Sequence, residues 1–255
     1  MKLLIVDAMN LIRRMYAAAE GSATQLDATQ SRCLAAIDRN IEALQATHVV
    51  MVFEQHGDTW RHQLYADYKL GRKPMPEALA HALPDVRRYF EQAGIASLYI
   101  PHWEADDVIA TLANKAALTG VDVVIMSTDK GFCQLVNARI RVRNHFERFD
   151  WDEERVTERF ALRPSQLVDF WAMTGDSTNH LPGVAGIGPK TAGQLLDQHQ
   201  ELDRIFCALP ELEERWQQAL QKHWQDALLT RVLARLRLDV PLGIHLRDLR
   251  CRKAH

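Results

Sequence analysis

Residues 3–7 read LLIVD, a short apolar run that ends in an aspartate. The same arrangement returns at residues 48–54 (HVVMVFE) and at residues 121–129 (VDVVIMSTD), where an acid follows the apolar run directly or closely. Short, continuously apolar runs are typical of strands that are buried on both faces, as in a parallel sheet. These three segments therefore predict buried strands, each with a carboxylate near its carboxyl end.

Helical patterns separate these strands. Residues 8–46 are compatible with helix, residues 76–93 have a helical pattern, and residues 104–118 place apolar side chains on one face. Shorter strand signals stand at residues 97–100 and 139–142. Because strands that alternate with helices are typical of a mostly parallel sheet with helices on both faces, we expect an α/β core over residues 1–160.

The strand signals stop after about Phe160. Helical patterns follow at residues 164–175, 189–198, 211–222 and 225–237. Between the first two, Leu181–Lys190 (LPGVAGIGPK) is dense in glycine and proline and predicts a tight turn between helices. No linker rich in serine or glycine marks a boundary, so we expect a helical region over residues 161–255 that packs directly on the core.

Composition excludes several classes of protein. The 255 residues are 47% hydrophobic and carry 31 basic and 33 acidic side chains, which excludes a disordered chain and a general polycation. The four cysteines are scattered and form no C-x-x-C motif, which argues against zinc-ribbon and thioredoxin-like readings. No signal peptide and no run of 18 apolar residues is evident, so we expect a cytoplasmic protein without a membrane span.

Six acids follow the strand candidates closely. They are Asp7, Glu54, Glu104, Asp106, Asp107 and Asp129. Because the carboxyl ends of parallel strands meet at one edge of the sheet, these carboxylates should converge there. Their mutual repulsion would force protonation unless divalent cations offset it, and oxygen ligands suit Mg²⁺ or Mn²⁺ better than zinc. Such a cluster is typical of chemistry on phosphate esters. The alternative for an isolated EADD motif is a helix start whose acids complement the helix dipole.

Residues 60–73 (WRHQLYADYKLGRK) interleave basic and aromatic side chains. Cations bind phosphates and rings stack on bases, so this pattern favours contact with nucleic acid. Lys69 and Arg72 have the spacing of one helical face, from which they would bring positive charge to a scissile phosphate. The alternative is a solvated loop with buried aromatic residues.

The Gly-Pro turn carries Gly183, Gly186 and Gly188 just before Pro189 and Lys190, where a helix is expected to begin. Backbone N–H groups at such a helix start form a seat for phosphate. It is not a dinucleotide-binding fingerprint, because no strand precedes it. A plain turn between helices is the alternative.

Taken together, these blocks resemble the 5′-nuclease or flap endonuclease family, and most closely its short bacterial branch, the exonuclease IX type. The resemblance spans roughly residues 1–240 and rests on LLIVDAMNLIRR, WRHQLYADYKLGRKPMP, EADDVIATLA, STDKGFCQL and MTGDSTNHLPGVAGIGPKTA. It implies an α/β nuclease core, a helical arch over the active site, and a helix–three-turn–helix motif that grips DNA.

The resemblance also implies residue roles. Asp7, Glu54, Glu104, Asp106 and Asp107 would form a first metal site, and Asp129 and Asp176 would belong to a second. Arg14, Lys69 and Arg72 would contact the scissile phosphate, with Tyr68 beside them. Gly186, Ile187, Gly188, Pro189, Lys190 and Thr191 would hold the duplex backbone, and the carbonyls of Met173, Thr174, Pro182, Val184 and Ile187 would hold K⁺.

Three positions depart from the family pattern. Glu54 stands where an aspartate is usual, which keeps the carboxylate with a longer reach. Gly131 and Asn179 each stand where an acid is usual, so only Asp129 and Asp176 remain at the second site. The depletion bears on the rate of catalysis more than on the class of substrate.

The sequence therefore predicts a Mg²⁺-dependent, structure-selective 5′ nuclease that acts as a monomer on DNA with 5′ flaps or branches. One rival is a flap- or junction-binding protein with weak or absent catalysis, because the second metal site is depleted. Another is an RNA-cleaving nuclease of the PIN type, against which the Gly-Pro turn argues, since small PIN domains lack a module that grips duplex.

Overall fold

The computed structural model describes residues 1–22, 24–54 and 57–251. Its centre is a six-stranded sheet of order β3-β2-β1-β4-β5-β6, parallel except for the antiparallel pair β5–β6. The strands are β1 (Lys2–Asp7), β2 (His48–Val52), β3 (Ala96–Leu98), β4 (Asp122–Met126), β5 (Ile140–Asn144) and β6 (Phe149–Trp151). The register pairs Val6 with both Met51 and Met126, so the central strands end at the same level.

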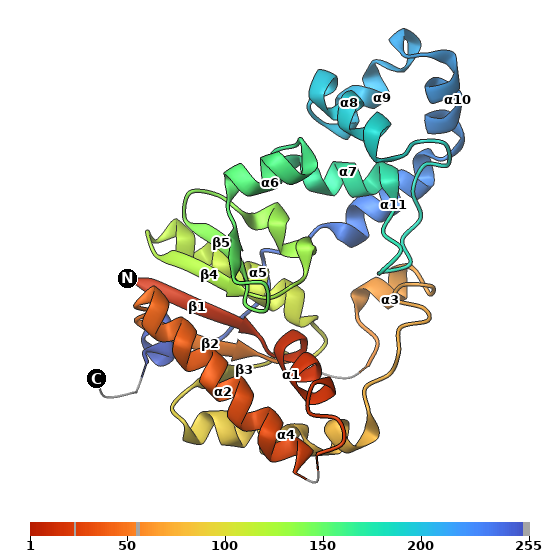
Figure 1. Cartoon of the computed structure of the whole chain (residues 1–255). Helices are drawn as coiled ribbons and strands as arrows, with labels where there is room; N and C mark the ends of the chain where they lie inside the picture. The colour runs from red at the N-terminus through yellow and green to blue at the C-terminus, as the bar shows by residue number, and fades with distance from the viewer. Residues whose placement is uncertain (23, 55–56, 252–255) are drawn as a thin grey trace.

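Helices cover both faces of the sheet (Figure 1). One face is covered by α1 (Ala8–Ala17), α2 (Gln25–Leu44) and α4 (Glu77–Gln92), and the other by α5 (Ala105–Leu118). The side chains of β1 alternate between the two faces of the sheet. Leu4 and Val6 pack with α1, α2 and α4, whereas Leu3 and Ile5 pack with α5. All four are fully buried, which explains why the strand reads as a continuous apolar run.

The second half of the chain is helical apart from the β5–β6 hairpin. Its helices are α6 (Glu153–Phe160), α7 (Leu167–Thr174), α8 (Pro189–His199), α9 (Leu202–Cys207), α10 (Glu214–Lys222) and α11 (Trp224–Ala234). Short 3₁₀ segments stand at Lys130–Leu135, Pro164–Gln166, Leu209–Glu211 and Leu246–Leu249. Within the described residues, no helix combines the length and the apolarity that crossing a membrane requires.

The chain ends by returning to the sheet (Figure 1). After α11, the segment 235–251 runs along α5, where Thr111 Oγ1 donates to the carbonyl of Arg237 at 3.0 Å. Arg250 then pairs with His48, and the Cys251 N–H donates to the Thr47 carbonyl at 3.0 Å. The helical region is therefore joined to the core at both of its ends.

The predicted mixed α/β fold, with its mostly parallel sheet, is confirmed. The structure adds β6, α6 and α9, which the sequence analysis did not predict. It also shows that one prediction about residues 60–73 is wrong. Helix α3 covers only Trp60–Leu64, and Lys69 lies in the following turns with a left-handed φ of 57°, so Lys69 and Arg72 do not share a helical face.

Candidate active site

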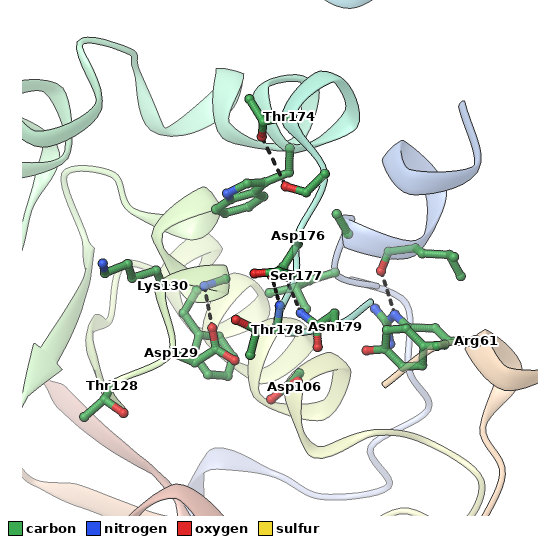
Figure 2. A pocket seen from close by; sticks show the side chains of 18 of the residues that line it. Arg61, Asp106, Thr128, Asp129, Lys130, Thr174, Asp176, Ser177, Thr178 and Asn179 are labelled. Atoms are coloured by element: carbon green, nitrogen blue, oxygen red, sulfur yellow. Dashed lines mark hydrogen bonds between the residues drawn. The ribbon is translucent and has the colours of Figure 1, made fainter. Parts of the chain in front are cut away.

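A cleft of about 770 Å³ opens at the carboxyl edge of the sheet, between the core and the helical region (Figure 2). Asp106 from α5, Asp129 after β4 and Asp176 after α7 line it together. Arg14, Tyr68 and Arg72 line the same cleft. Of the six acids that follow the predicted strands, Asp106 and Asp129 line this cleft, and Asp176 joins them from the helical region.

A hydrogen-bond network joins the ends of β1 and β4. Ser127 Oγ donates to Asp7 Oδ2 at 2.8 Å and accepts from the Asp129 N–H at 3.1 Å. Asn10 receives the Thr128 N–H at 3.2 Å, while its own N–H donates to Asp7 Oδ1 at 3.1 Å. The network fixes Asp7 and Asp129 relative to each other.

Asp7 and Asp106 have raised pKa values. Burial raises the pKa of Asp7 to about 6, helped by repulsion from Asp129 and Glu54 and opposed by its bonds to Ser127 and Asn10. Burial also raises the pKa of Asp106 well above its usual value; Lys69 opposes this rise, and repulsion from Asp129, Asp7 and Glu104 adds to it. Both carboxyls therefore hold a proton more tightly than an ordinary aspartate does, and a divalent cation that binds here competes with that proton.

Glu104 is held by cations instead. Its carboxylate accepts from Lys69 Nζ at 3.2 Å, Arg61 Nη1 at 3.1 Å and Tyr68 Oη at 3.1 Å, and it is only 1% exposed. Burial opposes ionisation, but Lys69 and Arg61 hold the pKa of Glu104 below its ordinary value. Burial alone would lower the pKa of Lys69, yet the attraction of Asp106 and Glu104 raises it, so Lys69 stays charged. Lys69 also approaches Glu54, whose Oε1 lies 3.9 Å from Nζ.

Asp107 lies in a different setting from the other predicted metal ligands. It is fully buried, and both its oxygens accept from Arg61, at 2.7 and 2.8 Å. Trp60 Nε1 donates to Oδ2 and the Arg237 N–H donates to Oδ1, both at 2.9 Å. The two oxygens of Asp107 thus accept four hydrogen bonds, and Asp107 is the counter-ion of Arg61. The resemblance implied a different role for it, that of a metal ligand.

Arg61 is the largest fully buried side chain that the structure describes. Besides Glu104 and Asp107, it donates to the carbonyls of Leu233 at 2.8 Å and Arg235 at 3.2 Å, where α11 ends. Its guanidinium lies 4.4 Å from the Trp60 ring centroid. In the sequence, Arg61 is one of several basic residues of the stretch 60–73, but in the structure it connects α3, α5 and α11.

Asp176 is held by its own turn. Its oxygens accept from the Thr178 N–H at 2.9 Å and from Asn179 Nδ2, and Asn179 Oδ1 in turn accepts from Arg72 Nη2 at 2.6 Å (Figure 2). The Lys69 N–H donates to the Asn179 carbonyl at 2.9 Å. Asn179 therefore links Arg72 and Lys69 to the turn that carries Asp176. The family resemblance predicts an aspartate at this position.

The Gly-Pro turn is tightly packed at its start. A Cβ on Gly183 would lie 2.5 Å from the Gly175 nitrogen and 2.6 Å from the Thr174 carbonyl carbon, so no larger residue fits without moving the backbone. Gly186 has a left-handed φ of 91°, and Lys190 is exposed in the first turn of α8. Of the carbonyls expected at the K⁺ site, those of Met173, Pro182 and Val184 accept hydrogen bonds within the protein.

The donor chemistry fits a hard divalent cation, since Asp7, Asp106 and Asp129 offer carboxylate oxygens and Asp106 forms no hydrogen bond of its own in the described chain. In residues 1–22, 24–54 and 57–251, however, no three such groups lie close enough to enclose an ion by themselves. An ion bound here would therefore keep water on part of its coordination shell, as Mg²⁺ does in proteins.

The raised pKa of Asp7 predicts a pH-dependent response to Mg²⁺. Its ordinary value is 3.8 and its folded value about 6, so the metal-free fold binds the proton more tightly than the unfolded chain does and loses stability as pH rises between these values. We expect Mg²⁺ to raise the melting temperature clearly at about pH 8 and much less at about pH 5, where protons compete. Thermal melting with Mg²⁺ and with EDTA checks this, and equal shifts at both pH values would contradict it.

Comparison with known proteins places the chain in a family. The model of the 5′-3′ exonuclease N-terminal resolvase-like domain matches residues 2–161, and that of the 5′-3′ exonuclease C-terminal SAM fold matches residues 162–255. Flap endonuclease Xni of Klebsiella pneumoniae is 44% identical over 97% of both chains. Flap endonuclease Xni of Pectobacterium carotovorum is also 44% identical, over 97% of this chain and 94% of the relative.

Solved structures agree on the fold. The T5 5′-exonuclease with bound zinc superposes with a TM-score of 0.80 at 19% identity, covering 92% of this chain and 89% of the other. The catalytic core of Rad2 in complex with DNA superposes with a TM-score of 0.57 at 18% identity, covering 94% and 73%. The resemblance read from the motifs is confirmed by two family models that together span residues 2–255, and the chain belongs to the 5′-3′ exonuclease family.

Proposed function

We propose that this chain, a structure-selective 5′ nuclease of the flap endonuclease type, hydrolyses a phosphodiester bond in branched DNA at the cleft that Asp106 lines. The single observation that carries the proposal is that the Asp106 carboxyl, which forms no hydrogen bond or ion pair with the part of the chain that the structure describes, lines a cleft together with Arg14 and Arg72. A cleft lined by carboxyls that ionise when a cation binds, with arginines beside them, fits a phosphate that arrives together with a divalent ion. Relatives of 44% identity that are named flap endonucleases support the same activity.

The residues divide the work as follows. Asp7, Asp106 and Asp129 would hold the ion, with Glu54 within reach, and the ion would supply Lewis acidity and a nucleophilic water. Lys69 and Arg72 would offset charge on the phosphate, and Arg14 would hold the neighbouring backbone. Glu104 positions Lys69 through their ion pair, and the Tyr68 hydroxyl donates to the same carboxylate. Asp107 is left out of the proposed ligand set because Arg61 holds both its oxygens.

A cleavage assay tests this function directly. We expect a 5′-flap DNA duplex to be cut in single-turnover reactions with Mg²⁺ and to remain intact in EDTA. Tight binding to the flap without cutting in any divalent metal would overturn the proposal in favour of the junction-binding alternative. Mn²⁺ and Mg²⁺ are compared in parallel, and RNA flaps serve as the second substrate, since a preference for RNA would point to the PIN-type rival.

The division of labour between the two halves is also a proposal. Residues 1–160 would carry the chemistry and residues 161–255 would grip duplex through the turn before α8, and the boundary between the two family models at residues 161 and 162 supports this division. A monomer in the cytoplasm remains a prediction from the sequence.

Lys190→Ala is expected to weaken binding to DNA of any sequence about equally and to reduce the slope of log K against log salt by about one unit, because one phosphate contact is lost. Fluorescence anisotropy in EDTA over a salt series measures the slope. Replacing Na⁺ by K⁺ in the same assay tests the proposed carbonyl site. Equal affinities in the two salts would contradict K⁺ binding while leaving the phosphate contact standing.

Restoring the two missing acids should strengthen the binding of a second Mg²⁺ ion, which would appear as a second phase in a Mg²⁺ titration. Gly131→Asp together with Asn179→Asp would surround Asp129 and Asp176 with additional carboxylates, and a Cβ on Gly131 would lie 3.1 Å from Asp129 Oδ1. The double variant should bind flap DNA more weakly in EDTA, because it repels phosphate, and cut faster at millimolar Mg²⁺. An unchanged Mg²⁺ titration by calorimetry and by cleavage would show that the missing acids do not limit the enzyme.

A further inference from the structure

A second depression opens out from the active-site cleft. A cavity of about 320 Å³ shares Arg14, Thr128 and Lys130 with the cleft and reaches Phe146, in the turn between β5 and β6. Phe146 also lines the next cavity, of about 530 Å³, between that turn and α2. The shared Phe146 places these two cavities next to each other, and we call the pair the arginine groove. It is lined by Arg14, Lys130, Phe146, Arg148, Arg39 and Arg159.

The charge of the arginine groove stands out against a chain whose net charge is −2. Glu147 is the acid among the residues that line these two cavities. Arg143 at the groove is paired with Asp150 at 2.6 Å, but Arg39, Arg148 and Arg159 form no ion pair with an acid of the described chain. These cations are therefore available to a ligand from outside.

An aromatic ring stands in the middle of these cations. Phe146 is 38% exposed, and the Arg14 guanidinium lies 5.4 Å from its ring centroid. The pKa of the neighbouring His145 is lowered, mainly by burial. The positive charges of Arg39, Arg143 and Arg148 lower it further. Arg148 holds a left-handed φ of 58°, a conformation that asparagine or glycine would adopt more easily. Cations flanking an exposed ring suit a sugar–phosphate backbone with an unstacked base.

We propose that the arginine groove binds a DNA strand that continues from the reacting phosphodiester, with phosphates on Arg39 and Arg148 and a base on Phe146. The groove adjoins the cleft at Arg14 and Lys130. The residues that line these two cavities include none from α8 or from the turn before it, so the groove is a separate contact from the Gly-Pro turn. The proposal rests on the proposed function for its substrate but not for its test, which requires no cleavage.

The test is binding of fluorescein-labelled flap DNA in EDTA over a salt series. Arg39→Ser with Arg148→Asn should weaken binding at least about tenfold and lower the log–log salt slope by about 1.5–2 units, because two phosphate contacts are lost. Asparagine keeps the left-handed turn possible. The matched control is Arg87→Ser with Arg88→Asn on α4, which removes the same charge from exposed positions paired with Glu91 and Asp85.

Two further readouts separate binding from other effects. Single-turnover cleavage with Mg²⁺ by the α4 control should match the parent protein, since Arg87 and Arg88 are placed neither in the reaction nor in the groove. Phe146→Ala, compared with Phe146→Leu, should abolish the fluorescence change of a 2-aminopurine base placed next to the junction. Unlabelled single-stranded DNA and unlabelled blunt duplex are then used as competitors of the labelled flap. The competitor that displaces it from the parent protein but not from the arginine variant shows whether the groove binds an unpaired strand or duplex.

Unchanged affinity and salt slope in the Arg39 and Arg148 variant would overturn the proposal. So would an equal loss in the α4 control, which would show only an effect of net charge. Failure of the proposed function looks different: the protein would not cut flap DNA in any metal, while the arginine variant would still bind it more weakly than the parent.

Discussion

Asp106→Asn is expected to reduce cleavage of flap DNA by at least about 100-fold, as removal of one transition-state stabiliser does in other enzymes. The same change should raise the melting temperature of the metal-free protein at about pH 8, because it removes a buried carboxyl that Asp129 and Asp7 repel. Single-turnover kinetics and thermal melting in EDTA measure the two effects. Full activity of Asp106→Asn at saturating Mg²⁺ would show that Asp106 takes no part in the reaction.

The neighbouring Asp107→Asn is the matched control, and the opposite pattern is expected for it. Its oxygens accept from Arg61, Trp60 and Arg237, so the amide should lower stability strongly while leaving Mg²⁺ affinity close to that of the parent protein. If Asp107→Asn instead weakened Mg²⁺ binding at unchanged stability, Asp107 would be the metal ligand that the family resemblance implied.

Arg61→Met should destabilise the fold by about 3–5 kcal/mol, because Glu104 and Asp107 would be left as buried charges without their main partner. For a chain of this size, such a loss corresponds to a melting temperature lower by roughly 10 °C. The residual cleavage, assayed well below the melting temperature, should also fall, since Glu104 positions Lys69. Thermal melting and single-turnover cleavage report the two consequences.

Two companion variants identify the cause of that loss. Arg61→Lys keeps the charge, but a lysine cannot reach Glu104, Asp107 and the end of α11 together. Its melting temperature should therefore lie between those of the parent protein and Arg61→Met. Arg61→Met combined with Asp107→Leu removes both buried charges of the pair and should recover part of the stability. If Arg61→Met melted like the parent, the buried ion pairs would contribute little, and the packing of Trp60 would hold α3 in place.

The strands were predictable because burial on both faces leaves an unmistakable apolar run, as in Leu3–Val6. The position of Asp106 and Asp129 in one cleft fits the same argument, since parallel strands end at one edge. The antiparallel β6, with three residues and an edge position, has too little pattern to be recognised.

The parts that escaped prediction depend on contacts between distant segments. Arg61 looks like a solvated cation in the sequence, because its partners lie 43 to 174 residues away. The turn at Lys69 depends on a backbone bond to Asn179, which no local propensity reveals. Asp107 stands next to Asp106 in the sequence, yet adjacent helical positions face different directions, so only the fold separates a counter-ion from a cleft residue.

The return of residues 235–251 to the sheet has a consequence for synthesis of the chain. Val240, Leu242 and Leu249 complete the apolar layer over α5, and Arg250 and Cys251 bond to the loop and strand at residues 47 and 48. A nascent chain on the ribosome cannot close this layer until residues 235–251 have left the exit tunnel. Before that point the polypeptide passes through a stage with its sheet formed and one apolar face uncovered, a stage at which chaperone binding competes with aggregation.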